Sequence, residues 1–266
     1  MTSIIIVNYK NPPLLRLCLS SLKRALSANF KHEILVVDIA SIPETRNVIK
    51  EFPGVKITTF KENIGYTKGV NEGVKASSGD YILILNPDIV PMTKSIEGLT
   101  SYLAANTNIG LAGPRLLNFD GSVQNSAFRY YTPLTVLCRR SPLGHTPFGK
   151  KILNKFVMAD KKLNAPSEVE WLMGSAMLAS RKAIDKVGLM DENFFMYMSD
   201  VDWARRFWEN GFKVAYYPFS EMYHYHKRSS KGRFGPLDIF MNKQSRLHLV
   251  DAVRYFRKYG IKISNT

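Results

Sequence analysis

The feature that most constrains the fold of this chain is a regular alternation of short apolar runs with segments of helical spacing. The runs are rich in Val, Ile and Leu, which is typical of strands buried on both faces. Leucines recur with helical spacing over residues 12–26, just after the prolines that suit a helix start. This alternation predicts βαβ units and a mainly parallel sheet. The predicted strands cover residues 3–9, 33–40, 55–60 and 81–90.

Polar residues close three of these predicted strands. Asn8 and Tyr9 end the first, Asp38 ends the second, and the Asn-Pro-Asp turn at 86–88 follows the fourth. Ligands of open parallel sheets bind beyond the carboxyl ends of the strands. We therefore expect these polar groups to face one binding crevice.

The charge of the chain narrows the choice of partner. Lys and Arg number 37 against 22 Asp and Glu, a net charge of +15, which favours an anionic partner. Nucleic acid, phospholipid headgroups and phosphorylated small molecules all carry such charge. No recognised nucleic-acid-binding module is present, so we expect no nucleic-acid partner.

Cysteines and hydropathy indicate the compartment. Cys18 and Cys138 form neither a disulfide framework nor a metal-ligand spacing, which fits a reducing cytoplasm. The N-terminus lacks the basic leader and cleavage site of a signal peptide. No run of about 18 apolar residues occurs, so no membrane-spanning helix is predicted. We expect a soluble cytoplasmic protein, with association to a membrane surface left open.

Two segments of the second half are strongly basic. Residues 138–168 are rich in Lys, Arg, Pro and Gly, and they are predicted to form a long loop with at most one short helix. Residues 235–260 show helical periodicity with apolar and basic side chains interleaved, which predicts an amphipathic helix.

The stretch "LILNPDIV", residues 83–90, ends a buried strand with Asp88. Such an aspartate is often only a turn former or a helix cap. Alternatively, its carboxylate holds a divalent cation on a diphosphate, since Mg²⁺ commonly takes one or two carboxylates plus phosphate oxygens. The motif alone leaves both interpretations open.

The stretch "ENIGYTKGVNEG", residues 62–73, has glycines at 65, 69 and 73 around a helix start. Backbone N–H groups can approach an anion closely there, and the helix dipole favours it. The alternative is a helix whose small residues pack on the sheet. Neither a G-x-G-x-x-G sequence nor a P-loop is present.

The stretch "FFMYMSDVDWARRF", residues 194–207, sets Asp200 and Asp202 in an apolar, aromatic run. Carboxylates are costly to bury there unless they are paired or used. Residues two apart on a helix do not share a face, so only one of them can face a given pocket. Asp202 can reach Arg205 or Arg206 and is the predicted structural residue. Asp200, whose pKa desolvation would raise, is the predicted general base.

His224 and His226 share a face if they lie on a strand, which makes a two-histidine metal site conceivable. No third ligand is adjacent, and histidines beside basic residues are common at surfaces. A single histidine that helps to hold a cation or a phosphate is the favoured hypothesis.

Taken together, these motifs resemble the family 2 glycosyltransferases of the GT-A fold, especially the rhamnosyltransferase-like branch. The resemblance covers nearly the whole chain. "ILVVDIAS" is similar to V-V-D-N-A-S, "ENIGYTKGVNEG" to N-x-G-[FY]-x-x-G-x-N-x-G, "LILNPDIV" to a D-x-D-like turn, and "SDVDWARR" to E-D-V-D-L-x-x-R. It implies a Rossmann-like, mainly parallel sheet flanked by helices. It also implies an inverting transfer of a sugar from a nucleotide-diphosphate donor, with dTDP-L-rhamnose as the donor in this branch.

The resemblance implies a single domain over 1–266, with a nucleotide-sugar-binding half (1–115), an acceptor-binding and catalytic half (116–235) and a C-terminal amphipathic helix (236–266). Asp200 then acts as the catalytic base, and Mg²⁺ or Mn²⁺ is the cofactor. The expected site residues are Tyr9, Asp38, Gly65, Tyr66 and Asp88 for the nucleotide, Trp171, Gly174 and Ser175 for the acceptor, and Asp88 with His224 for the metal.

Acceptors in this branch imply a glycan or a lipid-diphosphate-linked glycan at the cytoplasmic face of the membrane. The basic segment 139–162 and the C-terminal helix are then expected to dock on anionic lipid. The alternative is a solvated basic surface.

Two residues depart from the family pattern. Ile39 replaces an asparagine after Asp38, and Ser199 replaces a glutamate before Asp200. Serine cannot act as a base without activation. If the base belonged at position 199, the chain would be an impaired homologue that acts as a scaffold or binds sugar nucleotides. A sugar-nucleotide pyrophosphorylase is disfavoured, because "NYKNPPLL" is not the Gly-rich basic loop that such an enzyme needs.

Overall fold

The chain folds around one mixed sheet, described here by a computed structural model that covers residues 1–225 and 243–260. The strand order is β3-β2-β1-β4-β11-β6-β12-β5, with β7 beside β6 and β9 beside β12. β11 and β5 run antiparallel to their neighbours, whereas β3, β2, β1 and β4 are parallel, as are β6 and β12. The predicted α/β class with a mainly parallel central sheet is confirmed.

The strands have the following bounds: β1 Thr2–Tyr9, β2 His32–Ile39, β3 Lys56–Thr59, β4 Tyr81–Leu85, β5 Ile89–Pro91, β6 Ile109–Leu117, β7 Val123–Gln124, β8 Ala127–Phe128, β9 Ser167–Glu168, β10 Trp171–Leu172, β11 Ala176–Ser180 and β12 Lys213–His224. β10 and β8 form a separate antiparallel pair. The large sheet takes strands from both predicted halves of the chain; the division into nucleotide and acceptor halves of one domain stays a prediction.

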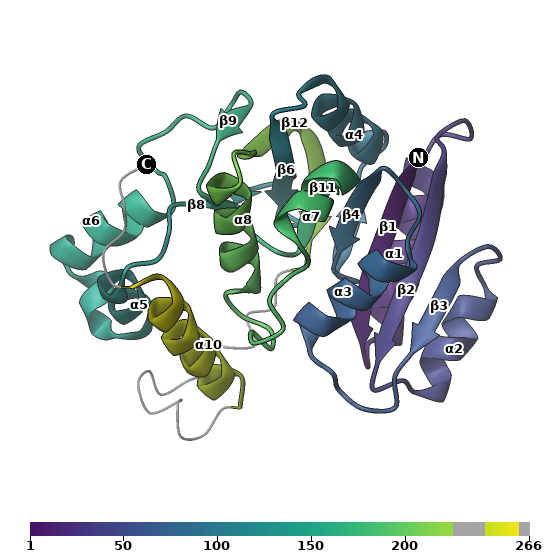
Figure 1. Cartoon of the computed structure of the whole chain (residues 1–266), viewed down its shortest axis with the longest axis horizontal. Helices are drawn as coiled ribbons and strands as arrows, with labels where there is room; N and C mark the ends of the chain where they lie inside the picture. The colour runs from purple at the N-terminus through teal and green to yellow at the C-terminus, as the bar shows by residue number, and fades with distance from the viewer. Residues whose placement is uncertain (226–242, 261–266) are drawn as a thin grey trace.

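Helices cover both faces of the sheet (Figure 1). Their bounds are α1 Pro12–Ala25, α2 Pro43–Lys50, α3 Tyr66–Ala76, α4 Ser95–Ala105, α5 Pro133–Arg140, the 3₁₀ helix η1 Pro142–His145, α6 Pro147–Phe156, α7 Arg181–Val187, α8 Ser199–Glu209 and α10 Lys243–Tyr259. Helices α1, α2 and α4 share one core with the sheet, and helices α3, α7, α8 and α10 share the other.

Strand β1 shows how the two cores arise. Ile4 and Ile6 belong to the core beneath α1, and Ile5 and Val7 to the core beneath α3, because successive side chains of a strand point to opposite faces. All four are nearly or fully buried. Each such burial stabilises the fold by roughly 1.5–3 kcal/mol.

The helix predicted over residues 12–26 is α1. The Asn11 side chain accepts a hydrogen bond from the backbone N–H of Leu14, and the two prolines occupy a first turn that has no intrahelical bonds to lose. The next turns bury one stripe of leucines against the sheet, formed by Leu15, Leu19 and Leu22.

Two predictions about secondary structure were wrong. Residues 138–168 are not a long loop, because they hold the end of α5, then η1, α6 and β9. Pro142 and Pro147 stand at helix starts, where proline is favoured, and the Thr146 hydroxyl accepts a hydrogen bond from the N–H of Gly149. The strand predicted over 81–90 is two strands, since β4 ends at Leu85 and β5 pairs with β12 instead.

Three helices of the second half gather at one end of the molecule. Figure 1 shows α5, α6 and α10 together at the left, opposite α2 and β3. The described part of the predicted C-terminal helix is α10; the rest of 235–260 lies outside the described residues. Among the helices described, none is both long and apolar enough to cross a bilayer.

Candidate active site

The carboxyl ends of β1 and β2 bring the first predicted residues together. The Asn8 amide donates a hydrogen bond of 2.7 Å to Oδ1 of Asp38. Asp38 is fully buried, and its Oδ2 has no hydrogen-bond partner within the described residues. A buried oxygen without a partner is costly, so this carboxylate suits a ligand donor such as a nucleotide base or ribose hydroxyl. Tyr9 follows at the edge of the crevice and is half exposed.

Asp88 and His224 meet at the end of β12. The Nε2 of His224 lies 3.6 Å from Oδ2 of Asp88. The side-chain amide nitrogen of Gln124 donates hydrogen bonds to the His224 carbonyl and to the Asn118 side chain. The Oε1 of Gln124 therefore faces Nδ1 of His224, at a distance of 2.9 Å. This assignment places the proton of a neutral imidazole on Nδ1 and leaves the Nε2 lone pair toward Asp88.

The same pair fits a divalent cation. Oδ1 of Asp88 is buried and has no protein partner in the part of the chain that the structure describes. Imidazole nitrogen and carboxylate oxygen are ordinary ligands, and Mg²⁺ and Mn²⁺ sites commonly complete their shell with phosphate oxygens and water. No cluster of three or more His, Cys, Asp or Glu occurs in residues 1–225 and 243–260. The predicted partner His226 lies outside the described residues.

Asp200 occupies the first turn of α8. Its Oδ2 accepts a hydrogen bond of 3.0 Å from the N–H of Gly174, and its Oδ1 accepts one of 2.9 Å from the N–H of Val201. Burial raises the pKa of this carboxyl to about 6 despite those hydrogen bonds, which act in the opposite direction. Such a group is ionised at neutral pH yet close to the pKa that suits a general base.

Tyr66 links the two carboxylates. Its hydroxyl donates a hydrogen bond of 2.6 Å to the carbonyl of Gly174, the residue whose N–H contacts Asp200. Burial raises the pKa of Tyr66, and the charges of Asp200 and Asp88 raise it further. The backbone N–H of Asn86 donates a hydrogen bond of 2.9 Å to the Ser175 carbonyl, so the turn that carries Asp88 adjoins the Gly174–Ser175 segment that contacts Asp200. That the two aspartates serve one site stays a prediction.

The glycines of the 62–73 stretch divide into two kinds. Gly65 precedes α3 with φ of 85°, and a Cβ there would lie 2.8 Å from both the ring and the carbonyl oxygen of Phe195. Gly73 packs closely on Ile5: a Cβ added to Gly73 would lie 2.3 Å from Cγ2 of Ile5. The packing interpretation therefore holds for Gly73 and also for Gly69, whereas Gly65 joins α3 to the segment before α8.

The predicted acceptor residues are not equivalent. Ser175 is buried, with a hydroxyl that has no partner among the described residues. Trp171 is only 5% exposed, and its ring stacks on Phe128 with the centroids 4.5 Å apart. Its indole N–H donates to the carbonyl of Arg129. Since protein covers this ring, Trp171 supports the neighbouring segment and offers an acceptor sugar no open ring face.

Asp202 has the structural role predicted for it. It is fully buried and accepts a hydrogen bond of 2.9 Å from Nε of Arg206. Lys258 and Tyr259 of α10 each add a hydrogen bond of 2.7 Å to its other oxygen. The Ser199 hydroxyl is buried and donates to the Met196 carbonyl at 3.4 Å, so it does not contact Asp200.

The profile of one enzyme family, described as Glycosyl transferase family 2, matches residues 3–164 of the chain. The chain is a family 2 glycosyltransferase. It is 31% identical over 244 residues to the N-acetylglucosaminyl-diphospho-decaprenol L-rhamnosyltransferase of Mycobacterium tuberculosis, an alignment that covers 86% of this chain and 77% of that protein. It is 26% identical to the rhamnosyltransferase WbbL of Escherichia coli K12, over 72% of this chain and 67% of that one.

Solved structures show that this glycosyltransferase has the GT-A fold. A crystal structure of GalNAc-T7 with UDP, GalNAc and Mn²⁺ aligns with a TM-score of 0.63 at 19% identity, covering 84% of this chain and 43% of that chain. Staphylococcus aureus TarS aligns with a TM-score of 0.60 at 13% identity, covering 100% of this chain and 46% of that one. The glycosyltransferase spans less than half of either solved chain, and at these identities the likeness concerns the fold alone.

One residue of the glycosyltransferase site was missed at the sequence level. Asp251 of α10 is fully buried and accepts hydrogen bonds from three successive backbone N–H groups, those of Phe195, Met196 and Tyr197, at 3.4, 3.2 and 3.0 Å. These residues lead directly into α8 and Asp200. A lone aspartate between Val250 and Ala252 was the available signal, since a carboxylate on an apolar stripe needs partners.

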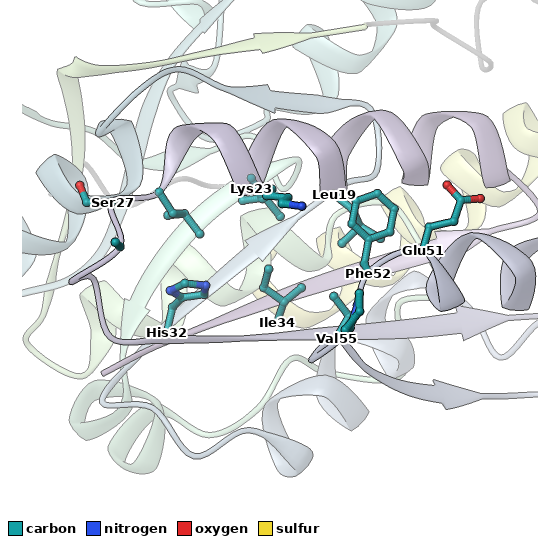
Figure 2. A pocket seen from close by; sticks show the side chains of 12 residues that line it. Leu19, Lys23, Ser27, His32, Ile34, Glu51, Phe52 and Val55 are labelled. Atoms are coloured by element: carbon teal, nitrogen blue, oxygen red, sulfur yellow. The ribbon is translucent and has the colours of Figure 1, made fainter.

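Two cavities of the described structure lie away from the predicted catalytic and metal-binding residues. Each has a volume of about 330 Å³ and borders the sheet, and neither is lined by Asp88 or Asp200. Figure 2 shows the first, in which Leu19 of α1 and Ile34 of β2 face each other. The second lies between β6, β8 and residues 157–164. The predicted donor residues at the strand ends line neither of these two cavities.

Proposed function

We propose that this glycosyltransferase transfers a sugar, with inversion, from a nucleotide-diphosphate donor to a glycan or lipid-diphosphate-linked acceptor in cell-surface polysaccharide synthesis. The observation that carries the proposal is Asp200, a desolvated carboxylate with a pKa of about 6 beside the Tyr66–Gly174 contact and near Asp88. A base of this kind is what activation of an acceptor hydroxyl requires.

The chemistry uses Asp200 as the only proton acceptor. Its carboxylate removes the proton of the acceptor hydroxyl, and the hydroxyl oxygen bonds to the anomeric carbon. The bond from that carbon to the nucleotide diphosphate breaks at the same time, and the diphosphate leaves with the bonding electrons. The proton stays on Asp200, and the configuration at the anomeric carbon inverts because attack and departure occur on opposite sides.

Residues at the strand ends would hold the donor. Asp38, whose Oδ2 has no protein partner among the described residues, supports contact with the nucleoside, and Tyr9 and the Gly65–Tyr66 turn border the same crevice. Asp88 and His224 would hold Mg²⁺ or Mn²⁺, which supplies neutralising charge to a diphosphate. Gly174 and Ser175, which lie against Asp200 and the 86–88 turn, would line the acceptor side.

The relatives support a particular donor and acceptor. Two of them carry rhamnosyltransferase in their names, and the Mycobacterium tuberculosis protein is named for an N-acetylglucosaminyl-diphospho-decaprenol acceptor. We take L-rhamnose from dTDP-rhamnose as the first donor to test. A catalytically impaired homologue remains the alternative because of Ser199, although that hydroxyl contacts the Met196 carbonyl rather than the site.

The test is a transfer assay with a panel of nucleotide sugars, Mg²⁺ or Mn²⁺, and N-acetylglucosamine diphosphate on a short alkyl chain. Asp200→Asn is expected to keep nucleotide binding and to lose transfer by roughly a hundredfold to ten-thousandfold. Asp185→Asn, on the exposed side of α7, is the matched control and keeps the parent rate. Full activity of Asp200→Asn would refute the assignment. Donor binding by the parent chain without hydrolysis or transfer would favour the impaired scaffold.

We also place the protein on the cytoplasmic face of the membrane, through α5, α6 and α10. Leu137 of α5, Phe148 of α6 and Val250 of α10 are large, apolar and exposed, and all three helices carry exposed basic residues. Figure 1 shows these helices at one end of the molecule. Apolar side chains among Lys and Arg suit an anionic bilayer surface.

Co-sedimentation with vesicles tests this docking. Binding is expected with anionic vesicles at low salt and not with zwitterionic vesicles. Replacement of Leu137 and Val250 by serine should weaken it, whereas Leu17→Ser, at an exposed apolar position on α1, should not. A parent chain that fails to bind anionic vesicles at low salt would exclude the docking surface.

A further inference from the structure

Three basic side chains that the proposed site does not use stand on α5 and α10. Arg139 and Arg140 stand in the last turn of α5, and His248 stands on α10. The sequence pattern alone gave them no role beyond a basic segment. We name them the basic cluster.

Arg139 is held in a fixed position by aromatic side chains. Its Nη1 donates a hydrogen bond of 2.5 Å to the Tyr131 hydroxyl, and its guanidinium carbon lies 5.1 Å from the ring centroid of Phe156. Among the described residues, no ion pair involves Arg139. A guanidinium fixed without a carboxylate partner is ready to receive an anionic ligand.

His248 connects the basic cluster to the catalytic segment. Its ring centroid lies 4.8 Å from that of Tyr197, three residues before Asp200. Its Nδ1 is buried and lacks a hydrogen-bond partner in residues 1–225 and 243–260. A buried polar nitrogen left unpaired is costly, so it indicates a group that a ligand completes.

Electrostatics places the members of the basic cluster close to one another and to Asp200. Burial lowers the pKa of His248 to about 3, and the charges of Arg140 and Arg139 lower it further. The charge of Arg139 also lowers the pKa of Asp200. The geometry agrees, since the Tyr131 ring that holds Arg139 lies 5.5 Å from the ring of Trp171, three residues before Gly174, whose N–H contacts Asp200.

Two acidic groups on neighbouring segments are engaged elsewhere. Asp251, one turn after His248, accepts its hydrogen bonds from the backbone of residues 195–197 and lies 3.3 Å from Arg254. Asp160, beyond the end of α6, forms an ion pair of 2.7 Å with Arg129. The charges of Arg139 and Arg140 outnumber the single carboxylate of Asp200, so the net charge at the basic cluster is positive and favours an anion.

We propose that Arg139, Arg140 and His248 bind the diphosphate of a sugar 1-diphosphate acceptor, and that they select this acceptor over an uncharged glycoside. The inference rests on the proposed function. A hydroxyl that contacts Asp200 is separated by only one sugar ring from the diphosphate on the same sugar. A basic cluster on segments that adjoin the base therefore suits these phosphates, while Asp88 and His224 serve the donor's diphosphate.

The position of the basic cluster also fits a lipid on that diphosphate. Leu134 and Leu137, on the same helix as the two arginines, are exposed apolar side chains. A lipid that leaves the diphosphate at the end of α5 would run along these leucines toward the bilayer.

The experiment compares two acceptors that differ only in charge: N-acetylglucosamine diphosphate on a short alkyl chain, and the neutral alkyl glycoside of the same sugar. Assays run well above the pKa of Asp200, so that loss of the Arg139 charge does not change its ionisation. The parent is expected to prefer the diphosphate. Arg139→Gln and Arg140→Gln should each reduce that preference roughly tenfold through the KM of the diphosphate acceptor, since charge-assisted hydrogen bonds are lost.

Lys150→Gln, on exposed α6, is the matched control for removal of one positive charge and should keep the preference. An unchanged preference in both arginine variants would overturn the inference. A parent that uses the neutral glycoside as well as the diphosphate would also overturn the inference. The proposed function as a glycosyltransferase would be unaffected by that result. If the parent neither transfers the sugar to either acceptor nor hydrolyses the donor, the proposed function is refuted, and the inference with it.

Discussion

Replacing the proposed base should make the protein more stable at neutral pH while it abolishes transfer. In the folded chain the pKa of Asp200 is about 6, above its ordinary value of 3.8, because burial disfavours the ionised carboxylate. The folded state therefore binds this proton more tightly than the unfolded state does. Stability contributed by the protonated group is present below pH 3.8 and is lost as the pH rises through about 6. Above that pH the buried charge is a net cost.

The magnitude follows from the size of the shift. A difference of about two pKa units corresponds to about 3 kcal/mol at 1.36 kcal/mol per unit. Asparagine carries no charge at any pH, so Asp200→Asn escapes this cost. Its single carbonyl oxygen can satisfy only one of the N–H groups of Gly174 and Val201, which costs about 1 kcal/mol. The expected net gain is about 2 kcal/mol at about pH 8, and it disappears near pH 4.

Urea unfolding of the parent and of Asp200→Asn at several pH values measures this difference. The gain should shrink as the pH falls, whereas Asp185→Asn, whose carboxylate is exposed, should show no such trend. In parallel, kcat/KM of the parent should fall as the pH drops below about 6, because the base becomes protonated. A stability difference that stays constant with pH, or a less stable Asp200→Asn at about pH 8, would refute the reasoning.

Three further substitutions test other parts of the site. Gly65→Ala should lower the free energy of unfolding by roughly 2–4 kcal/mol, since the added Cβ would lie 2.8 Å from Phe195. The control Gly54→Ala has φ of 92° but open space around it, and it should lower the free energy of unfolding by only about 1 kcal/mol. Urea unfolding measures both values. Asp251→Asn should lower kcat roughly tenfold with little change in donor KM, and an unchanged kcat would contradict its positioning of Asp200. Asp202→Asn should destabilise the fold by roughly 3–5 kcal/mol, measured by thermal unfolding, and a stable variant would argue against a buried ion-pair network.

Much of the site followed from the sequence because local geometry determines it. Parallel strands end at one edge of a sheet, so Asp38 after β2 and Asp88 after β4 stand at the same edge, and their common binding crevice stays a prediction. Helical spacing likewise separated Asp200 from Asp202 and paired the latter with Arg206 four residues on. These relations involve neighbours along the chain or a repeat of fixed period.

Other features were misjudged because a local signal has two meanings. Proline marks a loop and also the first turn of a helix, so Pro142 and Pro147 hid η1 and α6 inside a predicted loop. An exposed and a buried tryptophan look alike in sequence; only the packing of Phe128 on Trp171 shows that its ring is covered.

Periods of two and 3.6 residues are local properties, so the sequence alone predicts the α/β sheet, the polar ends of its strands and the face of α8 that carries each aspartate. Only the tertiary structure decided what surrounds those carboxylates. Tyr259 reaches Asp202 across 57 residues of chain, and Asp251 reaches Tyr197 across 54. The pKa of Asp200 and the basic cluster at α5 and α10 depend on such distant contacts, since desolvation and charge act through space rather than along the chain.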